Sequence, residues 1–343
     1  MIETINNTDD SNGDIGGTIE TALDLLGAIA SVKLPENVRV YLLERCQIFH
    51  KKESFSGWGW DITLLHIASQ LVKSEKEADT IFSLLDNSDF SEFDREQAEE
   101  IKYELIKKMK GDHEADEFLA QYISNPELRR TAISKAIEDK NFEKAVSLAN
   151  DGIKCDTEDK PGLAKEWYDW LLRVALIQKD TANIIGYARF LFVDGFRHDQ
   201  DYYGIMKKHI NPDDWNEFVK GLVEDIRKNG SWLNIYKLAD IYITEQWWVE
   251  LLQLITQNRS LTFISNYEKH LSDIYPEEIS KLYELGIIDF LKQFADRKHY
   301  REACRYIRRM KKLGARKQVN NLVEKLRKEY PQRRALMEEL DLI

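Results

Sequence analysis

The side chains that could support catalysis or metal binding are scattered along this chain. Its three cysteines, Cys46, Cys155 and Cys304, lie far apart, and no Cys-x-x-Cys pair could hold a structural zinc ion. The phosphate-binding motif GxxxxGK[ST] and the motifs GxGxxG, HExxH and GxSxG are all absent. We therefore expect no resident metal, no cofactor and no enzymatic activity.

Weaker arrangements exist. The acidic segment Asp86–Asp94 resembles a calcium loop, but its fifth and sixth positions are Phe90 and Ser91, where an EF-hand needs an oxygen ligand and a glycine. Cys46 and His50 are four residues apart on one expected helix, yet two ligands rarely make a metal site. A catalytic pair of carboxylates on separate helices cannot be recognised from sequence, so an enzyme with a dispersed carboxylate site stays open as an alternative.

Two tryptophans form a second kind of candidate. Trp58 and Trp60 flank Gly59 in the segment 56–61, SGWGWD. A glycine-containing loop that presents two indoles could bind a ligand or partner. The structural interpretation, which we favour, is a loop anchored in the core by its aromatic rings and followed by a helix that begins near Asp61.

The elements that must position these residues are predicted to be helices. From Thr18 onward, apolar residues recur at helical spacing. Asn125-Pro126 and Asn211-Pro212 combine a capping side chain with a proline in the first turn. We also expect helix starts at the three further breaks Leu34-Pro35, Tyr275-Pro276 and Tyr330-Pro331, and a loop at Pro161-Gly162. Helix ends are expected at Gly152, Gly230 and Gly314.

Short helices in succession favour antiparallel pairs. Phe142, Ala145 and Ala149 line one face of an expected helix, and Tyr300 and Ala303 repeat the aromatic-to-small spacing in another. A small residue at that position lets a partner helix approach closely, as in tetratricopeptide (TPR) hairpins. The full TPR consensus is absent. We predict an all-α fold, an α-α superhelix or solenoid of degenerate TPR-like antiparallel helix pairs.

Composition suggests the domain organisation. Residues 1–17 are polar and acidic without periodicity, and we expect a disordered tail. The helical array is expected over 18–343, with a sub-boundary near 152–162 and a basic C-terminal cap over 297–343. No run of 18 apolar residues and no signal-peptide pattern occurs, so we expect a cytoplasmic protein that does not span a membrane.

Charge is unevenly distributed. Residues 297–334 contain fifteen Lys/Arg and three Glu, a net +12; because the whole chain carries −11, the rest carries −23. On a helix over 298–313, one basic row lies roughly 150° from the apolar stripe, at about 100° per residue. The candidate interaction residues of this basic stripe are Arg301, Arg305, Arg308, Arg309, Lys312, Arg316, Lys317, Arg333 and Arg334.

Three hypotheses for the basic stripe follow. It could be solvated or neutralised by the acidic remainder of the chain, it could bind nucleic-acid phosphates, or it could bind an acidic protein partner. A strongly acidic chain is a poor non-specific binder of nucleic acid. We therefore expect a non-catalytic scaffold that mediates protein–protein interaction, with nucleic-acid binding through the basic C-terminal helices as the alternative.

The C-terminal residues carry a family resemblance. The sequence YREAC over 300–304, the basic helix that follows and the segment 330–340, YPQRRALMEEL, resemble the end of bacterial SWIM zinc-finger family proteins. The zinc motif of that family, Cys-x-Cys followed by Cys-x-His, is absent here, so no zinc ligand carries over. The resemblance implies a helical region with an interaction role and no reaction.

Overall fold

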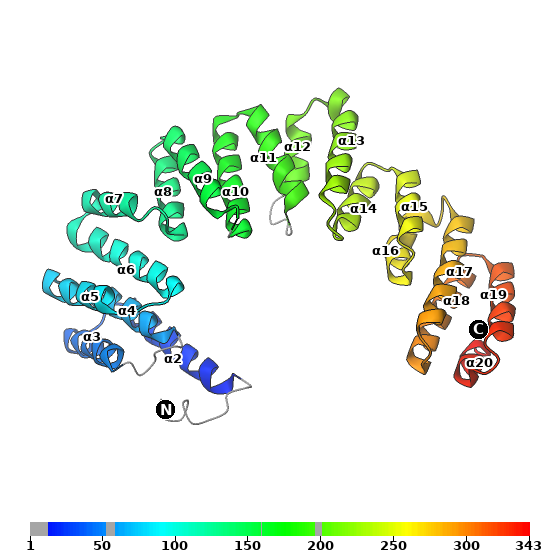
Figure 1. Cartoon of the computed structure of the whole chain (residues 1–343), viewed down its shortest axis with the longest axis horizontal. Helices are drawn as coiled ribbons and strands as arrows, with labels where there is room; N and C mark the ends of the chain where they lie inside the picture. The colour runs from blue at the N-terminus through cyan, green and yellow to red at the C-terminus, as the bar shows by residue number, and fades with distance from the viewer. Residues whose placement is uncertain (1–12, 53–58, 159, 196–200) are drawn as a thin grey trace. The chain divides into compact units, whose positions relative to one another are not determined.

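The computed structural model describes residues 13–52, 59–158, 160–195 and 201–343, which form helices joined by short connections (Figure 1). Within these ranges there are nineteen helices and no strand, so the all-α prediction is confirmed. None of the helices in this described part is long and apolar enough to cross a membrane.

The chain divides into two compact units, at residues 1–210 and 211–343. The helices of the first unit are α2 (Asp14–Ala30), α3 (Glu36–Lys51), α4 (Trp60–Leu71), α5 (Glu75–Asn87), α6 (Glu92–Lys110), α7 (Asp112–Gln121), α8 (Pro126–Glu138), α9 (Phe142–Asp156), α10 (Pro161–Gln178), α11 (Thr181–Asp194) and α12 (Tyr202–His209). The helices of the second unit are α13 (Pro212–Asn229), α14 (Asn234–Thr244), α15 (Trp248–Gln257), α16 (Leu261–Leu271), α17 (Pro276–Gln293), α18 (Arg297–Lys312), α19 (Arg316–Glu329) and α20 (Arg334–Leu340).

Within each unit, helices pack mainly against their neighbours in sequence, such as α8 on α9, α9 on α10, α16 on α17 and α17 on α18. The buried apolar residues of the first unit accordingly form several successive clusters. Such a row of local cores is typical of stacked helical arrays, in which each element contacts only its neighbours.

The expected helix starts are explained by capping. The side-chain oxygen of Asn125 accepts hydrogen bonds from the backbone N–H groups of Glu127 and Leu128 at 3.0 and 3.4 Å, with Pro126 in the first turn. Asn211 caps α13 in the same way. These bonds satisfy backbone donors that a helix start leaves unpaired.

Several boundary predictions were wrong. Residues 14–17 belong to α2 and not to a tail, while residues 1–12 lie outside the described part. Gly152 is inside α9 and does not end it. Its missing side chain makes room for the Trp167 ring, since a Cβ there would lie 2.8 Å from the indole.

Pro161 begins α10, so 152–162 is not a domain boundary; the division falls after Ile210. Pro331 lies in a turn, and α20 begins only at Arg334. Gly230 and Gly314 do end helices, with φ of 72° and 89°.

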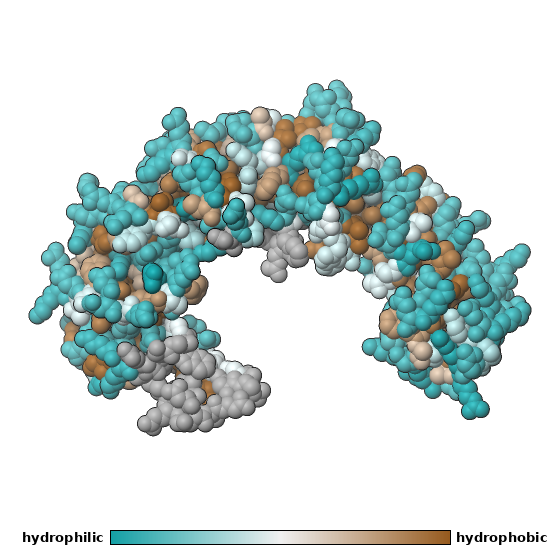
Figure 2. All heavy atoms as spheres, in the orientation of Figure 1, coloured by the Kyte–Doolittle hydropathy of each residue, from teal (hydrophilic) through white to brown (hydrophobic). Residues whose placement is uncertain are grey.

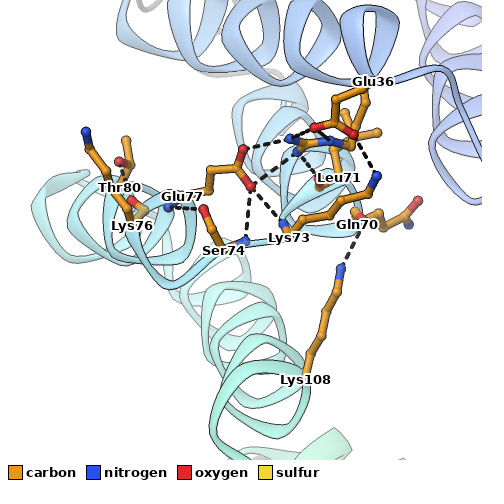
Figure 3. A network of polar contacts seen from close by, with 10 residues as sticks. Glu36, Gln70, Leu71, Lys73, Ser74, Lys76, Glu77, Thr80 and Lys108 are labelled. Atoms are coloured by element: carbon orange, nitrogen blue, oxygen red, sulfur yellow. Dashed lines mark hydrogen bonds and ion pairs between the residues drawn. The ribbon is translucent and has the colours of Figure 1, made fainter.

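A buried cation joins α3 to the end of α4 and the start of α5. Arg39 of α3 donates hydrogen bonds to the Leu71 carbonyl at 2.6 Å and to Glu77 at 2.8 Å, and its side chain also contacts Glu36. Figure 3 shows Glu36 of α3, Lys73 of the α4–α5 connection and Glu77 of α5 lying close together. Because all of these hydrogen bonds and ion pairs join groups within the chain, the network holds α3 against the α4–α5 connection.

Candidate interaction surface

Three helices of the second unit, α14, α16 and α18, lie side by side. Tyr236 of α14 packs edge-on against Phe263 of α16, with ring centroids 5.7 Å apart. On the other flank of α16, Glu268 and Ser265 contact Arg309 of α18, at 2.5 and 2.8 Å. In Figure 1 these helices alternate along the chain with α15 and α17. We call the exposed side of this row the α14/α16/α18 face.

A buried carboxylate fixes α18 to α16. Glu268 is 8% exposed, forms an ion pair with Arg309 at 2.5 Å and accepts a hydrogen bond from the Tyr283 hydroxyl of α17, also at 2.5 Å. Burial and the Glu268 carboxylate raise the pKa of Tyr283 well above its usual range. Arg309 was predicted to extend the exposed basic stripe. Its side chain is 40% exposed, but its guanidinium is paired with Glu268 of α16.

The rest of the stripe on α18 is on the surface. Arg301, Arg305, Arg308 and Lys312 are all exposed, while Tyr300, Ala303, Cys304 and Ile307 on the opposite side are buried. Arg308 and Lys312 have no ion pair or side-chain hydrogen bond within the described residues. Arg305 contacts Glu302 and the Tyr306 hydroxyl at 3.3 and 3.1 Å, and Arg301 contacts Glu339 at 3.1 Å. The Arg305–Glu302 pair is largely exposed and therefore weak, so the Arg305 guanidinium is still available to a partner. The Arg301 side chain is 65% exposed, although its partner Glu339 is buried.

Arg333 was also predicted to be an interaction residue, and its side chain is instead used inside the unit. It donates a hydrogen bond to the Leu291 carbonyl at 2.7 Å, and its guanidinium lies 4.2 Å from the centre of the Tyr330 ring. Arg333 therefore holds the connection before α20 against α17. Sequence spacing could not distinguish it from its exposed neighbour Arg334.

Three predicted residues remain exposed outside α18. Arg316 and Lys317 occupy the first turn of α19, and Arg334 begins α20. The first turn of α19 has no acidic residue and no capping side chain. Cations at this end of a helix oppose the helix dipole, so their placement costs about 0.3–1 kcal/mol each at low salt unless an anion compensates.

The Trp58–Trp60 loop is only partly described. Trp58 lies outside the described residues. Trp60 is 5% exposed and belongs to the core formed by α2 to α6. Its position agrees with an aromatic anchor at the start of α4 and is contrary to a ring presented to a partner.

Two of the three cysteines, Cys46 and Cys304, are buried, whereas Cys155 is exposed. Burial raises the pKa of the Cys46 and Cys304 thiols to about 11, which makes them poor nucleophiles at neutral pH. His50 is buried and lies 2.8 Å from the Ser88 hydroxyl. Among the described residues there is no group of three His, Cys, Asp or Glu side chains that could hold a metal ion.

One groove in the first unit contains perturbed titratable groups. It has a volume of about 680 Å³ and lies between the end of α2, α4 and α6, with His66, Glu100, Glu104 and Lys108 in its lining. Burial, together with the nearby Glu127 and Glu96 carboxylates, raises the pKa of Glu100 to about 7. Burial lowers the pKa of Lys108, whose ammonium donates a hydrogen bond to the Gln70 carbonyl at 3.1 Å. Perturbed groups in a groove are consistent with a ligand site, and the Glu100 side chain has no hydrogen bond or ion pair within the described residues.

Comparison with models of known protein families, with curated proteins and with solved structures gave no match. The surface must therefore be interpreted from its own chemistry. Figure 2 shows that hydrophilic side chains dominate the visible surface of α17 to α20. All three tyrosines beside the basic stripe, Tyr300, Tyr306 and Tyr330, are buried, so no aromatic ring is presented there for base stacking.

The α14/α16/α18 face also contains residues that the sequence did not single out. Trp232, just before α14, is 71% exposed, and Tyr236 is 40% exposed. Asp240 follows one turn later on the same side of α14 and is exposed. One feature of the sequence could have indicated the exposure of Trp232. This tryptophan follows shortly after the helix end at Asn229-Gly230, in a connection and not on the apolar side of a helix.

Proposed function

We propose that this protein is a non-catalytic helical-repeat scaffold of degenerate TPR-like helix pairs, and that it binds an acidic segment of a protein partner. The binding surface is the exposed row on α18 formed by Arg301, Arg305, Arg308 and Lys312. The observation that carries the proposal is the exposure of this row together with the absence of internal partners for Arg308 and Lys312 within the described residues.

The spacing of the row suits a linear acidic segment. Its members follow each other at four, three and four residues, so they form a straight line of about 16 Å along the helix at 1.5 Å per residue. An extended peptide advances about 3.3 Å per residue, and five residues cover that line. Arginine also pairs with carboxylates through two parallel hydrogen bonds, which gives geometric selectivity.

The surroundings of the row favour a protein partner over nucleic acid. Glu302, Glu338 and Asp341 lie among the basic residues of α18 to α20, and Glu338 and Asp341 are exposed. Carboxylates repel the continuous charge of a phosphate backbone but can pair with the mixed charges of a protein. The resemblance of 300–304 and 330–340 to the end of SWIM family proteins also favours an interaction role.

The test compares two anions on the full-length protein. A ten-residue peptide containing five Asp or Glu and a 20-base-pair DNA duplex are titrated at physiological and at doubled salt concentration. We expect the peptide to bind in the micromolar range and the duplex to bind more weakly at physiological salt. Tight duplex binding with a steep salt dependence, and no measurable peptide binding, would replace this proposal with the nucleic-acid alternative.

A further inference from the structure

The α14 end of the α14/α16/α18 face has an open aromatic surface. Trp232 is 71% exposed and packs edge-on against Tyr236, with ring centroids 6.4 Å apart at 82°. Tyr236 in turn packs edge-on against Phe263, which packs against Tyr267 at 4.9 Å. Phe263 and Tyr267 are buried, so they hold Tyr236 in place while its own ring remains accessible.

An exposed carboxylate, Asp240, follows Tyr236 on α14. Asp240 is one helical turn beyond Tyr236, and its charge contributes to the raised pKa of Tyr267, which places it close to that buried ring. No side-chain hydrogen bond or ion pair of Asp240 occurs within the described residues. An unpaired carboxylate beside accessible aromatic rings attracts an organic cation through its charge and through the negative faces of the rings.

We propose that Asp240, Tyr236 and Trp232 bind an arginine side chain of the same partner segment whose acidic residues lie on α18. The guanidinium pairs with Asp240 and covers the Tyr236 ring, and Trp232 packs against the aliphatic part of the segment. Arginine fits this site because it offers a planar cation that stacks on aromatic rings and an apolar stem. This inference rests on the proposed function. It adds which end of the face binds the arginine of the partner segment and how many residues separate that arginine from the acidic cluster.

The distance between the aromatic site on α14 and the basic row on α18 determines how far apart the arginine and the acidic residues of the partner segment should be. Contacts of α16 with α14 on one flank and with α18 on the other place the aromatic end and the basic row two helices apart. Packed helices are about 8–10 Å apart, so the two ends are separated by roughly 16–20 Å. An extended chain spans this distance in about six residues. The partner segment should therefore place an arginine about six residues from its acidic cluster.

The test uses full-length protein and two fluorescein-labelled peptides. The first has one Arg, five Gly/Ser residues and then four alternating Asp and Glu residues; the second has norleucine in place of Arg. We expect the Arg peptide to bind the wild type about two- to fivefold more tightly, as a partly exposed cation–π contact with a carboxylate predicts. Asp240→Asn and Tyr236→Leu should each remove most of this difference without weakening the norleucine peptide.

A matched control separates a local contact from a change in net charge. Glu224→Gln on α13 removes one exposed negative charge from the same unit, and it should preserve the preference for the Arg peptide. If the norleucine peptide binds and Arg adds nothing, or if Asp240→Asn and Glu224→Gln have equal effects, this inference is wrong while the proposed function stands. If neither peptide binds the wild type, the proposed function is wrong and this inference falls with it.

Discussion

Arg309 of α18 and Glu268 of α16 form a contact of 2.5 Å in which the carboxylate side chain is 11% exposed and the guanidinium side chain 40% exposed. The pair fixes the position of the basic row relative to α16. Removing the Arg309 guanidinium leaves the mostly buried Glu268 carboxylate without a cation, and its remaining hydrogen bond is to the Tyr283 hydroxyl.

We therefore predict that Arg309→Met lowers the free energy of unfolding by about 2 kcal/mol, below the range for fully buried pairs because the guanidinium reaches solvent. The double variant Arg309→Met/Glu268→Gln should be more stable than the sum of the single effects by about 1 kcal/mol. Urea denaturation of the four proteins measures both quantities. Strict additivity would mean that the two side chains do not stabilise each other.

Because Gly152 contacts Trp167 and Gly186 has open space around it, replacing each with alanine should change the free energy of unfolding in opposite directions. Gly152→Ala should destabilise the protein by about 1–3 kcal/mol, because the new methyl group would overlap an indole that is completely buried. Gly186→Ala, within α11 and with no atom within 4 Å of the new Cβ, should stabilise it by about 0.5–1 kcal/mol through helix propensity. Thermal or urea unfolding distinguishes them, and equal effects at the two positions would contradict the packing described for α9 and α10.

Glu100 should make stability depend on pH. Its folded pKa of about 7 exceeds the ordinary value of 4.5, so the folded state binds the proton more tightly than the unfolded state. The stabilisation is fully present below about pH 4.5 and is lost as the pH rises through about 7. Glu100→Gln should remove this loss, so that the variant gains on the order of 1–3 kcal/mol relative to wild type between pH 4.5 and pH 8.

Urea denaturation at pH 4.5 and pH 8 measures that difference. Glu104→Gln, an exposed position on the same groove, is the matched control and should leave the pH dependence of wild type in place. A Glu100→Gln protein whose stability changes with pH as the wild type does would show that Glu100 is not the group responsible.

The sequence predicted the fold class because its signals are local. Asn125-Pro126 and Asn211-Pro212 act through their own backbone neighbours, and the apolar spacing of α18 defines its buried side without reference to any other helix. Gly152 was misplaced because its role depends on Trp167, which reaches it from another helix. A glycine that makes room for a ring looks the same in sequence as one that ends a helix.

The exposed basic row on α18 was predicted in part for the same reason. Helical periodicity placed Arg305, Arg308 and Lys312 on the exposed side of α18 correctly. Arg309 lies at the edge of that side, and only the position of Glu268 on α16 shows that it is engaged. Trp232, Tyr236 and Asp240 could not be connected to the basic row, because the contacts that bring α14, α16 and α18 together join residues far apart in sequence.

The most direct test of the proposed interaction surface measures binding of the acidic ten-residue peptide to two charge-reversal variants by calorimetry. Arg305→Glu/Arg308→Glu reverses two residues of the row, and Lys325→Glu/Lys328→Glu makes the same net change on exposed positions of α19. We predict that the first variant loses at least about tenfold in affinity, since each exposed charge contact contributes up to about 1 kcal/mol and reversal adds repulsion. The second should stay within about threefold of wild type. Equal losses in the two variants, or wild-type affinity in the first, would contradict the assignment of the α18 row as the binding surface.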